Sequence, residues 1–178
     1  MVPDISARIT SILGSLIDVV QPAIDKNDAA AQEQAHLAIA SLRVVQNQLD
    51  YAHAFEAVDC QSLIALIRGI SEILQKECPP EVGRFASELT RPVVFTGQIR
   101  DANRRMRDLV ASLVEQAADA ADPQKFSRVT QSILAFEGLQ IRRDRAFVAG
   151  TGFDVEAETL VSIADSFGLA GANSGGKK

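Results

Sequence analysis

Apolar residues recur every three or four positions through nearly the whole chain, and this spacing limits the fold more than any other feature. An α-helix turns once in about 3.6 residues, so side chains at these intervals share one face and are buried together. No stretch alternates apolar and polar residues as a half-buried strand does. The sequence therefore predicts an all-α protein, a single-domain bundle of six or seven helices.

Prolines and capping residues predict where these helices begin and end. We expect Asp4, Asp59 and Asp154 to cap helix starts and Gly168 to follow the last helix. The second and fifth helices are expected to be the long central members. The expected spans are about 4–21, 28–57, 59–78, 81–89, from Pro92 to 121, 123–147 and 154–168.

The chain has 178 residues, which suits one domain with a sizeable core. We expect residues 1–168 to form the bundle and 169–178 to be a flexible polar tail, because the tail has few side chains to bury. No stretch approaches the ~20 uncharged apolar residues of a membrane span, and the N-terminal sequence lacks the features of a signal peptide. The expectation is a cytoplasmic protein without membrane contact.

The charge of the chain and the spacing of its cysteines argue against nucleic-acid binding and against a disulfide bond. The net charge of −5 and the pI near 5.0 argue against a nucleic-acid partner. Cys60 and Cys78 fall near opposite ends of one expected helix, about 27 Å apart at 1.5 Å per residue. A disulfide needs Cα atoms within about 7 Å, so both cysteines are expected to remain thiols.

Both histidines lie in one stretch, Glu33 to His53, whose "EQAH" has the Glu-x-x-His spacing of carboxylate-bridged metal sites. Such sites in four-helix proteins use two Glu-x-x-His motifs and two further glutamates, and this chain has one motif. His36 and His53 would lie about 25 Å apart along a helix. We therefore expect no bound metal and no cofactor, with His36 in solvent.

The segment "AHLAIAS" resembles the histidine phosphotransfer domains, helical bundles in which an exposed histidine accepts a phosphoryl group. In that family a Lys-Gly pair usually follows the histidine, and here Ile39 and Ala40 take its place. The resemblance covers a few residues around His36. It implies a phosphotransfer role for His36, which is the most distant of the functional alternatives.

Arg100, Arg104 and Arg107 share one flank of the fifth expected helix, in "QIRDANRRMRDL". Guanidinium groups bind oxyanions bidentately, so this flank is a candidate anion-binding site. Asp101 and Asp108 lie beside it, and Arg104 and Asp108 have the i,i+4 spacing of a helix ion pair. We favour a solvated, self-paired face, with anion binding as the alternative.

The sixth expected helix contains polar residues on its apolar arc, in "FEGLQIRRDRAF". Four apolar residues set the phase of this helix: Phe126, Val129, Ile133 and Leu134. With that phase, Glu137, Gln140 and Asp144 point inward. An unpaired buried carboxylate costs several kcal/mol, so these groups require partners.

Two interpretations of these inward groups remain open. In one, Glu137, Gln140 and Asp144 line a ligand pocket between helices, together with Tyr51 or His53. In the other, which we favour, the helix bends at Gly138 and turns them to solvent, or a neighbouring arginine neutralises them.

No nucleophile with a base, no metal cluster and no phosphate loop is recognisable in the sequence. We therefore expect a non-enzymatic binding, assembly or regulatory protein, and the alternative is an enzyme or small-molecule binder that uses the acidic inter-helix pocket. The second helix has an apolar arc too wide for one neighbour, and Ile39 interrupts its polar side. Such surface predicts a partner, so we expect a homodimer, with another protein as a further partner.

Overall fold

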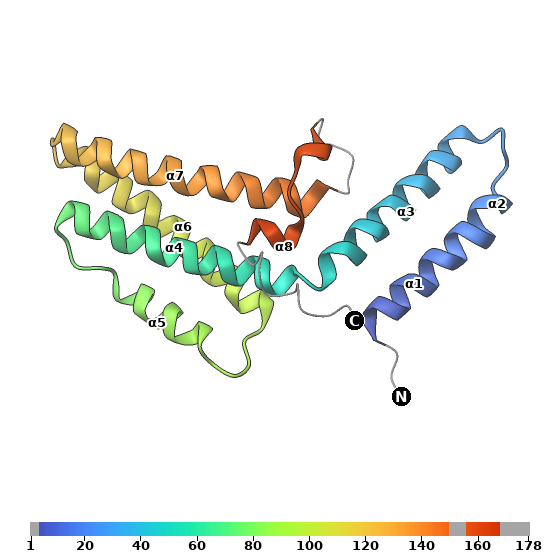
Figure 1. Ribbon diagram of the computed structural model, residues 1–178, viewed down its shortest axis with the longest axis horizontal. Coiled ribbons are helices and arrows are strands. Elements are labelled where there is room, and N and C mark those ends of the chain that lie inside the picture. Colours follow the sequence, from blue (N-terminus) through green and yellow to red (C-terminus); the bar gives the residue numbers. More distant parts are fainter. Residues whose placement is uncertain (1–3, 150–155, 168–178) are drawn as a thin grey trace, which may run out of the picture.

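The computed structural model describes residues 4–149 and 156–167, and every regular element in these ranges is a helix (Figure 1). The predicted all-α fold is confirmed. The elements are α1 (Ile5–Ser15), the short π-helix η1 (Leu16–Val20), α2 (Gln21–Ala23), α3 (Ala29–Leu49), α4 (Ala52–Leu74), α5 (Pro80–Leu89), α6 (Thr96–Asp119), α7 (Pro123–Val148), the short 3-10 helix η3 (Ala157–Thr159) and α8 (Ile163–Ser166).

Helix α4 is the centre of the larger part of the molecule, the four-helix unit formed by α4, α5, α6 and α7. Its apolar residues recur at intervals of three and four, and Ile67 and Ile70 are completely buried. They pack with Met106 of α6 and Val129 of α7 in one continuous core. The expectation that the second helix is central was wrong, because α4 takes that place with α6 as its main partner.

The expected helix over residues 28–57 is divided into two. α3 ends at Leu49, Asp50 and Tyr51 form a turn, and α4 begins at Ala52. The chain changes direction at this turn, which we call the elbow (Figure 1). No glycine or proline marks it, so local sequence gave no signal for a helix end.

Asp59 does not cap a helix. It lies inside α4, and only 4% of the residue is exposed. The prediction failed because α4 begins seven positions earlier, at the elbow, rather than at this carboxylate.

The segment Ile5–Leu49, which we call the arm, points away from the four-helix unit (Figure 1). Its helices α1 and α3 pack against each other over a small core of Ile9, Leu13 and Ile39. Ile39 was expected on a polar side of its helix, but it is buried, because α1 covers that side. Asp4 caps α1 as predicted, accepting a hydrogen bond of 2.7 Å from the backbone of Ala7.

The expected helix over 154–168 is represented in the described residues by two short pieces, η3 and α8. Asp154, Gly168 and the expected tail lie outside the described residues. Phe167 follows α8 and contacts the elbow, with its ring centroid 6.3 Å from those of Tyr51 and Phe55. The chain thus returns to the junction between arm and unit.

Two further expectations concern membrane-spanning helices and the cysteines. In the described part of the chain, no helix has both the length and the apolar character needed to cross a membrane. Cys60 is a buried free thiol and Cys78 an exposed one, as the spacing predicted.

The packing of α4 predicts a large difference between two isoleucines. Ile67→Ala should lower the free energy of unfolding by about 2–5 kcal/mol, because it opens a cavity in a filled core. Ile141→Ala on α7, where 54% of the residue is exposed, is the matched control and should change it by less than about 0.5 kcal/mol. Urea unfolding followed by circular dichroism measures both, and equal costs would contradict this description of the core.

Candidate functional site

Among the described residues, the buried charged groups are Asp59 and Arg143, and both lie where α4, α6 and α7 meet. Arg107 of α6 reaches across to Asp59 of α4, and its Nη2 lies 3.1 Å from Oδ1 and 3.0 Å from Oδ2. Arg143 of α7 is buried beside this pair, and its Nη1 donates to Ser62 Oγ at 3.0 Å. One carboxylate and two guanidinium groups therefore link three helices.

Burial controls the protonation of this cluster. Loss of solvent raises the pKa of the Asp59 carboxyl above its ordinary value of 3.8, against the opposing effect of Arg107. Loss of solvent also lowers the pKa of the Arg143 guanidinium, an effect that Asp59 opposes. The cluster is thus held in an environment that disfavours charge, and each group depends on the others.

A second polar link lies nearer the elbow. Glu56 of α4 accepts a hydrogen bond of 2.7 Å from Arg100 Nε. Asn103 Nδ2 donates to the Glu56 carboxylate and to its backbone carbonyl, both at 3.0 Å. These contacts fix the register of α4 against α6, which is a structural role.

The expected anion-binding flank is occupied by carboxylates of the chain itself. Arg100 pairs with Glu56, Arg107 with Asp59, and Arg104 with Asp101 at 3.2 Å. The first two pairs join helices, whereas the third is an exposed pair within α6 and contributes little to stability. The structure therefore favours the self-paired interpretation of this flank.

The acidic pocket, the less favoured of the two interpretations, is not assembled, and Glu137 faces solvent as the favoured one expected, although without the expected bend at Gly138. α7 runs straight through Gly138, yet Glu137 is exposed. The phase was wrong because Phe126 and Leu134, which helped to set it, are themselves 40% and 66% exposed. The buried face of α7 is instead Val129, Phe136, Gln140, Arg143 and Ala146.

The remaining members of that pocket lie apart. Gln140 is buried, and its Nε2 donates to Asp144 Oδ1 at 2.8 Å within the same helix. Tyr51 stands at the elbow beside a different groove, which Val44 and Ile163 also line. His53 is exposed, with Nδ1 3.3 Å from Thr96 Oγ1.

The histidines lie on different parts of the molecule. His36 is exposed on the arm, next to the side chain of Gln21, and the phosphotransfer role suggested for it stays a prediction. Among the described residues, no three His, Cys, Asp or Glu side chains are grouped closely enough to bind a metal ion.

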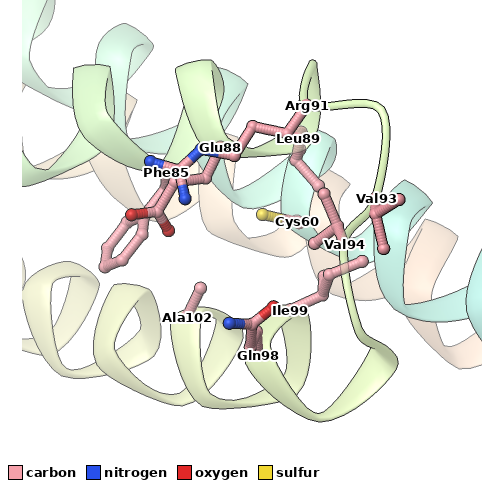
Figure 2. Close-up of a pocket in the computed structure, with 10 residues that line it drawn as sticks. All are labelled: Cys60, Phe85, Glu88, Leu89, Arg91, Val93, Val94, Gln98, Ile99 and Ala102. Atoms are coloured by element: carbon pink, nitrogen blue, oxygen red, sulfur yellow. The ribbon is translucent and has the colours of Figure 1, made fainter.

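The cavity drawn in Figure 2 lies between α5, α6 and the segment that joins them, with Cys60 of α4 at its inner end. Phe85, Val94 and Ile99 supply much of its apolar wall. Its volume is about 70 Å³, far below the roughly 300–1,000 Å³ of sites for drug-sized ligands. Burial raises the pKa of the Cys60 thiol to about 11, so this thiol is protonated and a poor nucleophile near neutral pH.

A wider groove runs over Arg143, between α4, α7 and α8. Val58, Leu139 and Phe167 form apolar walls, and Ser62 and Arg142 add polar groups. The groove has a volume of about 480 Å³. Arg143 lines this groove, and its buried Nε has no hydrogen-bond partner among the described residues.

Sequence reasoning missed Asp59 and Arg143 as buried groups. Asp59 was taken for a cap, and Arg143 was not singled out. The signal that would have found Arg143 is its spacing from Phe136 and Gln140, seven and three residues earlier on one helical face.

Comparison with known proteins yields no relative: no family model, no curated protein and no solved structure matches this chain.

The raised pKa of Asp59 predicts how stability changes with pH. At pH values between 3.8, the ordinary pKa, and the higher folded-state pKa of Asp59, the Asp59 carboxyl holds a proton in the folded protein that it has released in the unfolded chain. The contribution of Asp59 to the free energy of unfolding should be fully present below that range and decrease as pH rises through it. Each unit of pKa shift corresponds to about 1.4 kcal/mol.

Urea unfolding of the wild type and of Asp59→Asn from pH 3.5 to 8 isolates this contribution, since the variant cannot titrate at this position. The difference, wild type minus variant, should fall with rising pH. Gln61→Asn on the exposed side of α4 is the control and should give a difference independent of pH. A difference for Asp59→Asn that grows with pH would mean that the arginines outweigh burial.

Proposed function

We propose that the protein is a non-enzymatic assembly protein that binds another protein molecule through its arm. One observation carries the proposal: the arm has an exposed apolar surface on one side, which we call the arm face. It consists of Ile5 and Ile12 on α1 and Ala38 and Val45 on α3, and the three large residues are 63%, 49% and 46% exposed in chain order.

Helix geometry places these residues on the same side of the arm. At about 100° per residue, Ile5 and Ile12 are displaced by about 40–60° from the inward residue Ile9. Ala38 and Val45 have the same displacement, in the same sense, from Leu42, which packs against the small core of the arm. Two antiparallel helices are related by a two-fold axis normal to the plane that contains them. Residues turned by the same angle, in the same sense, from the inward residue of their own helix therefore lie on the same face of the pair.

The arm lacks the core that would make two helices stable by themselves. Only three of its apolar residues are buried, Ile9, Leu13 and Ile39, whereas α4 alone buries Leu63, Ile64, Leu66, Ile67, Ile70 and Leu74. Most helix stability in proteins comes from packing of an apolar face. A partner that covers the arm face would supply the missing packing.

The buried polar groups support a non-enzymatic role. Asp59 is engaged by Arg107, and Glu56 by Arg100 and Asn103, so these carboxylates hold helices together. Cys60 is a protonated, buried thiol. Cysteines kept as thiols are typical of a reducing compartment, so the proposal includes a cytoplasmic location.

The proposal predicts that charge on the arm face abolishes protein binding. Wild-type protein and the double variant Ile12→Glu, Val45→Glu would be immobilised and exposed to an extract of the cells that produce the protein. Proteins retained by the wild type, including the chain itself, should be lost from the variant, because a buried unpaired carboxylate costs several kcal/mol. Ile141→Glu, on the exposed side of α7, is the control and should retain the same proteins as the wild type. Retention of the same proteins by the wild type, the double variant and the control would refute the proposal.

A second candidate function rests on the groove over Arg143. The two arginines that line it, Arg142 and Arg143, and its apolar walls suit a small amphiphilic carboxylate, which replaces the acidic pocket as the small-molecule alternative. Titration calorimetry with octanoate should show binding that Arg142→Met weakens, because Arg142 is the exposed arginine of the groove and can be replaced without opening the core, and that Arg128→Met, on a distant exposed part of α7, does not weaken. Absence of heat at millimolar octanoate would reject this candidate.

A further inference from the structure

We infer that the molecule bound by the arm face is a second copy of this chain, and that the two arms pair antiparallel to form a four-helix bundle. The inference rests on the proposed function and names the partner of the same surface. Three independent features of the arm support it: the spacing of its apolar residues, the accessible area of the chain, and the placement of charge along the arm.

The spacing of apolar residues in the arm is that of a helix bundle. In α1 and the first residue of η1, the residues Ile5, Ile9, Ile12 and Leu16 alternate intervals of four and three. In α3 the same alternation continues for six residues: Ala31, Ala35, Ala38, Leu42, Val45 and Leu49. Residues at these intervals form the central seam of coiled coils and four-helix bundles.

Each seam is only half covered. Ile9 and Leu42 face the other helix of the arm, while Ile12, Ala38 and Val45 are exposed. A seam of this kind is complete when its helix has two neighbours, and each arm helix has one. Two arms placed face to face give every helix its second neighbour without any other protein.

The accessible area of the chain is larger than a compact monomer needs. It amounts to 12,121 Å², against about 8,400 Å² expected for a folded monomer of this mass. Even if the twenty residues outside the described ranges are assigned the area of an unfolded chain, an excess of about 1,600 Å² remains. A stable dimer buries about 800 Å² on each partner, so the excess is sufficient.

Charge along the arm selects the antiparallel arrangement. The end of the arm far from the elbow carries four carboxylates, Asp18, Asp25, Asp28 and Glu33, and one lysine, Lys26. A parallel pair would bring these two acidic ends together, which is unfavourable. In an antiparallel pair each acidic end lies beside the other end of the partner arm, where Arg8 and Arg43 are balanced by Asp4 and Asp50, so the repulsion between the two acidic ends is avoided.

Sedimentation equilibrium of the full chain from 1 to 100 μM tests the partner. The wild type should be a dimer, and Ile12→Glu or Val45→Glu should each raise the dissociation constant on the order of 100-fold, because a two-fold interface contains every substitution twice. Ile141→Glu should dimerise as the wild type does, and circular dichroism checks that all variants keep their helices. A monomeric wild type at 100 μM, or a dimer that neither arm-face variant weakens, overturns the inference.

A distance measurement tests the arrangement without altering the arm face. Ala23→Cys, at the far end of the arm, would be spin-labelled in the Cys78→Ser background, since Cys60 is buried. α3 has 21 residues, so antiparallel arms should hold the two labels about 30 Å apart or more at 1.5 Å per residue. A distance below about 20 Å would show parallel arms, and the absence of any distance between chains would exclude the paired arms altogether.

These results separate this inference from the proposed function. A monomeric wild type that captures a different protein, and loses it when Ile12 and Val45 are changed to Glu, overturns the second copy and leaves the assembly function intact. Identical capture by the wild type and the double variant overturns the function itself. A dimer sensitive to both substitutions, with labels far apart, supports both.

Discussion

The elbow at Asp50 and Tyr51 is the constraint on which the rest of the architecture depends. Without it, α3 and α4 would form one long helix, and the apolar residues of the arm would continue along the axis of the four-helix unit. Aromatic packing holds the turn, since the Phe55 ring lies 4.3 Å from that of Phe147 and 6.3 Å from that of Phe167. Gln48 also donates to the Phe147 carbonyl at 2.8 Å. The direction of the arm is therefore set by tertiary contacts with the end of α7.

The charged cluster of the four-helix unit determines how its helices are aligned more than it adds to the free energy of unfolding. Removing Asp59 and Arg143 from water costs free energy that the attraction between Asp59 and the two arginines offsets only in part, as the raised pKa of Asp59 indicates. An apolar cluster of the same volume would pack at least as well. It would not, however, fix how far α6 and α7 are shifted along α4, whereas Arg107 reaches Asp59 and Arg143 reaches Ser62 in one register alone. That register also places Phe147 against Phe55.

Sequence reasoning succeeded where the determinants are local. Pro80 and Pro123 mark helix starts, because proline suits the first turn, and the observed α5 and α7 begin at these residues. It failed where tertiary contacts decide. The elbow has no local breaker, and α7 was given the wrong phase because Leu134 is apolar but exposed while Arg143 is charged but buried. The candidate site failed for the same reason: Glu137 was placed inside by an arc that two exposed hydrophobic residues had shifted.

The unequal division of apolar residues between unit and arm links folding to assembly. α4 is covered by three helices, so the four-helix unit has a core of its own. The arm has three buried apolar residues, and Ile12 and Val45 are exposed, so few buried contacts oppose its local opening. A ligand that binds only the ordered form stabilises it by mass action, and the second arm that we propose as partner would be such a ligand. In the proposed dimer the order of the arm would therefore depend on protein concentration, while that of the four-helix unit would not.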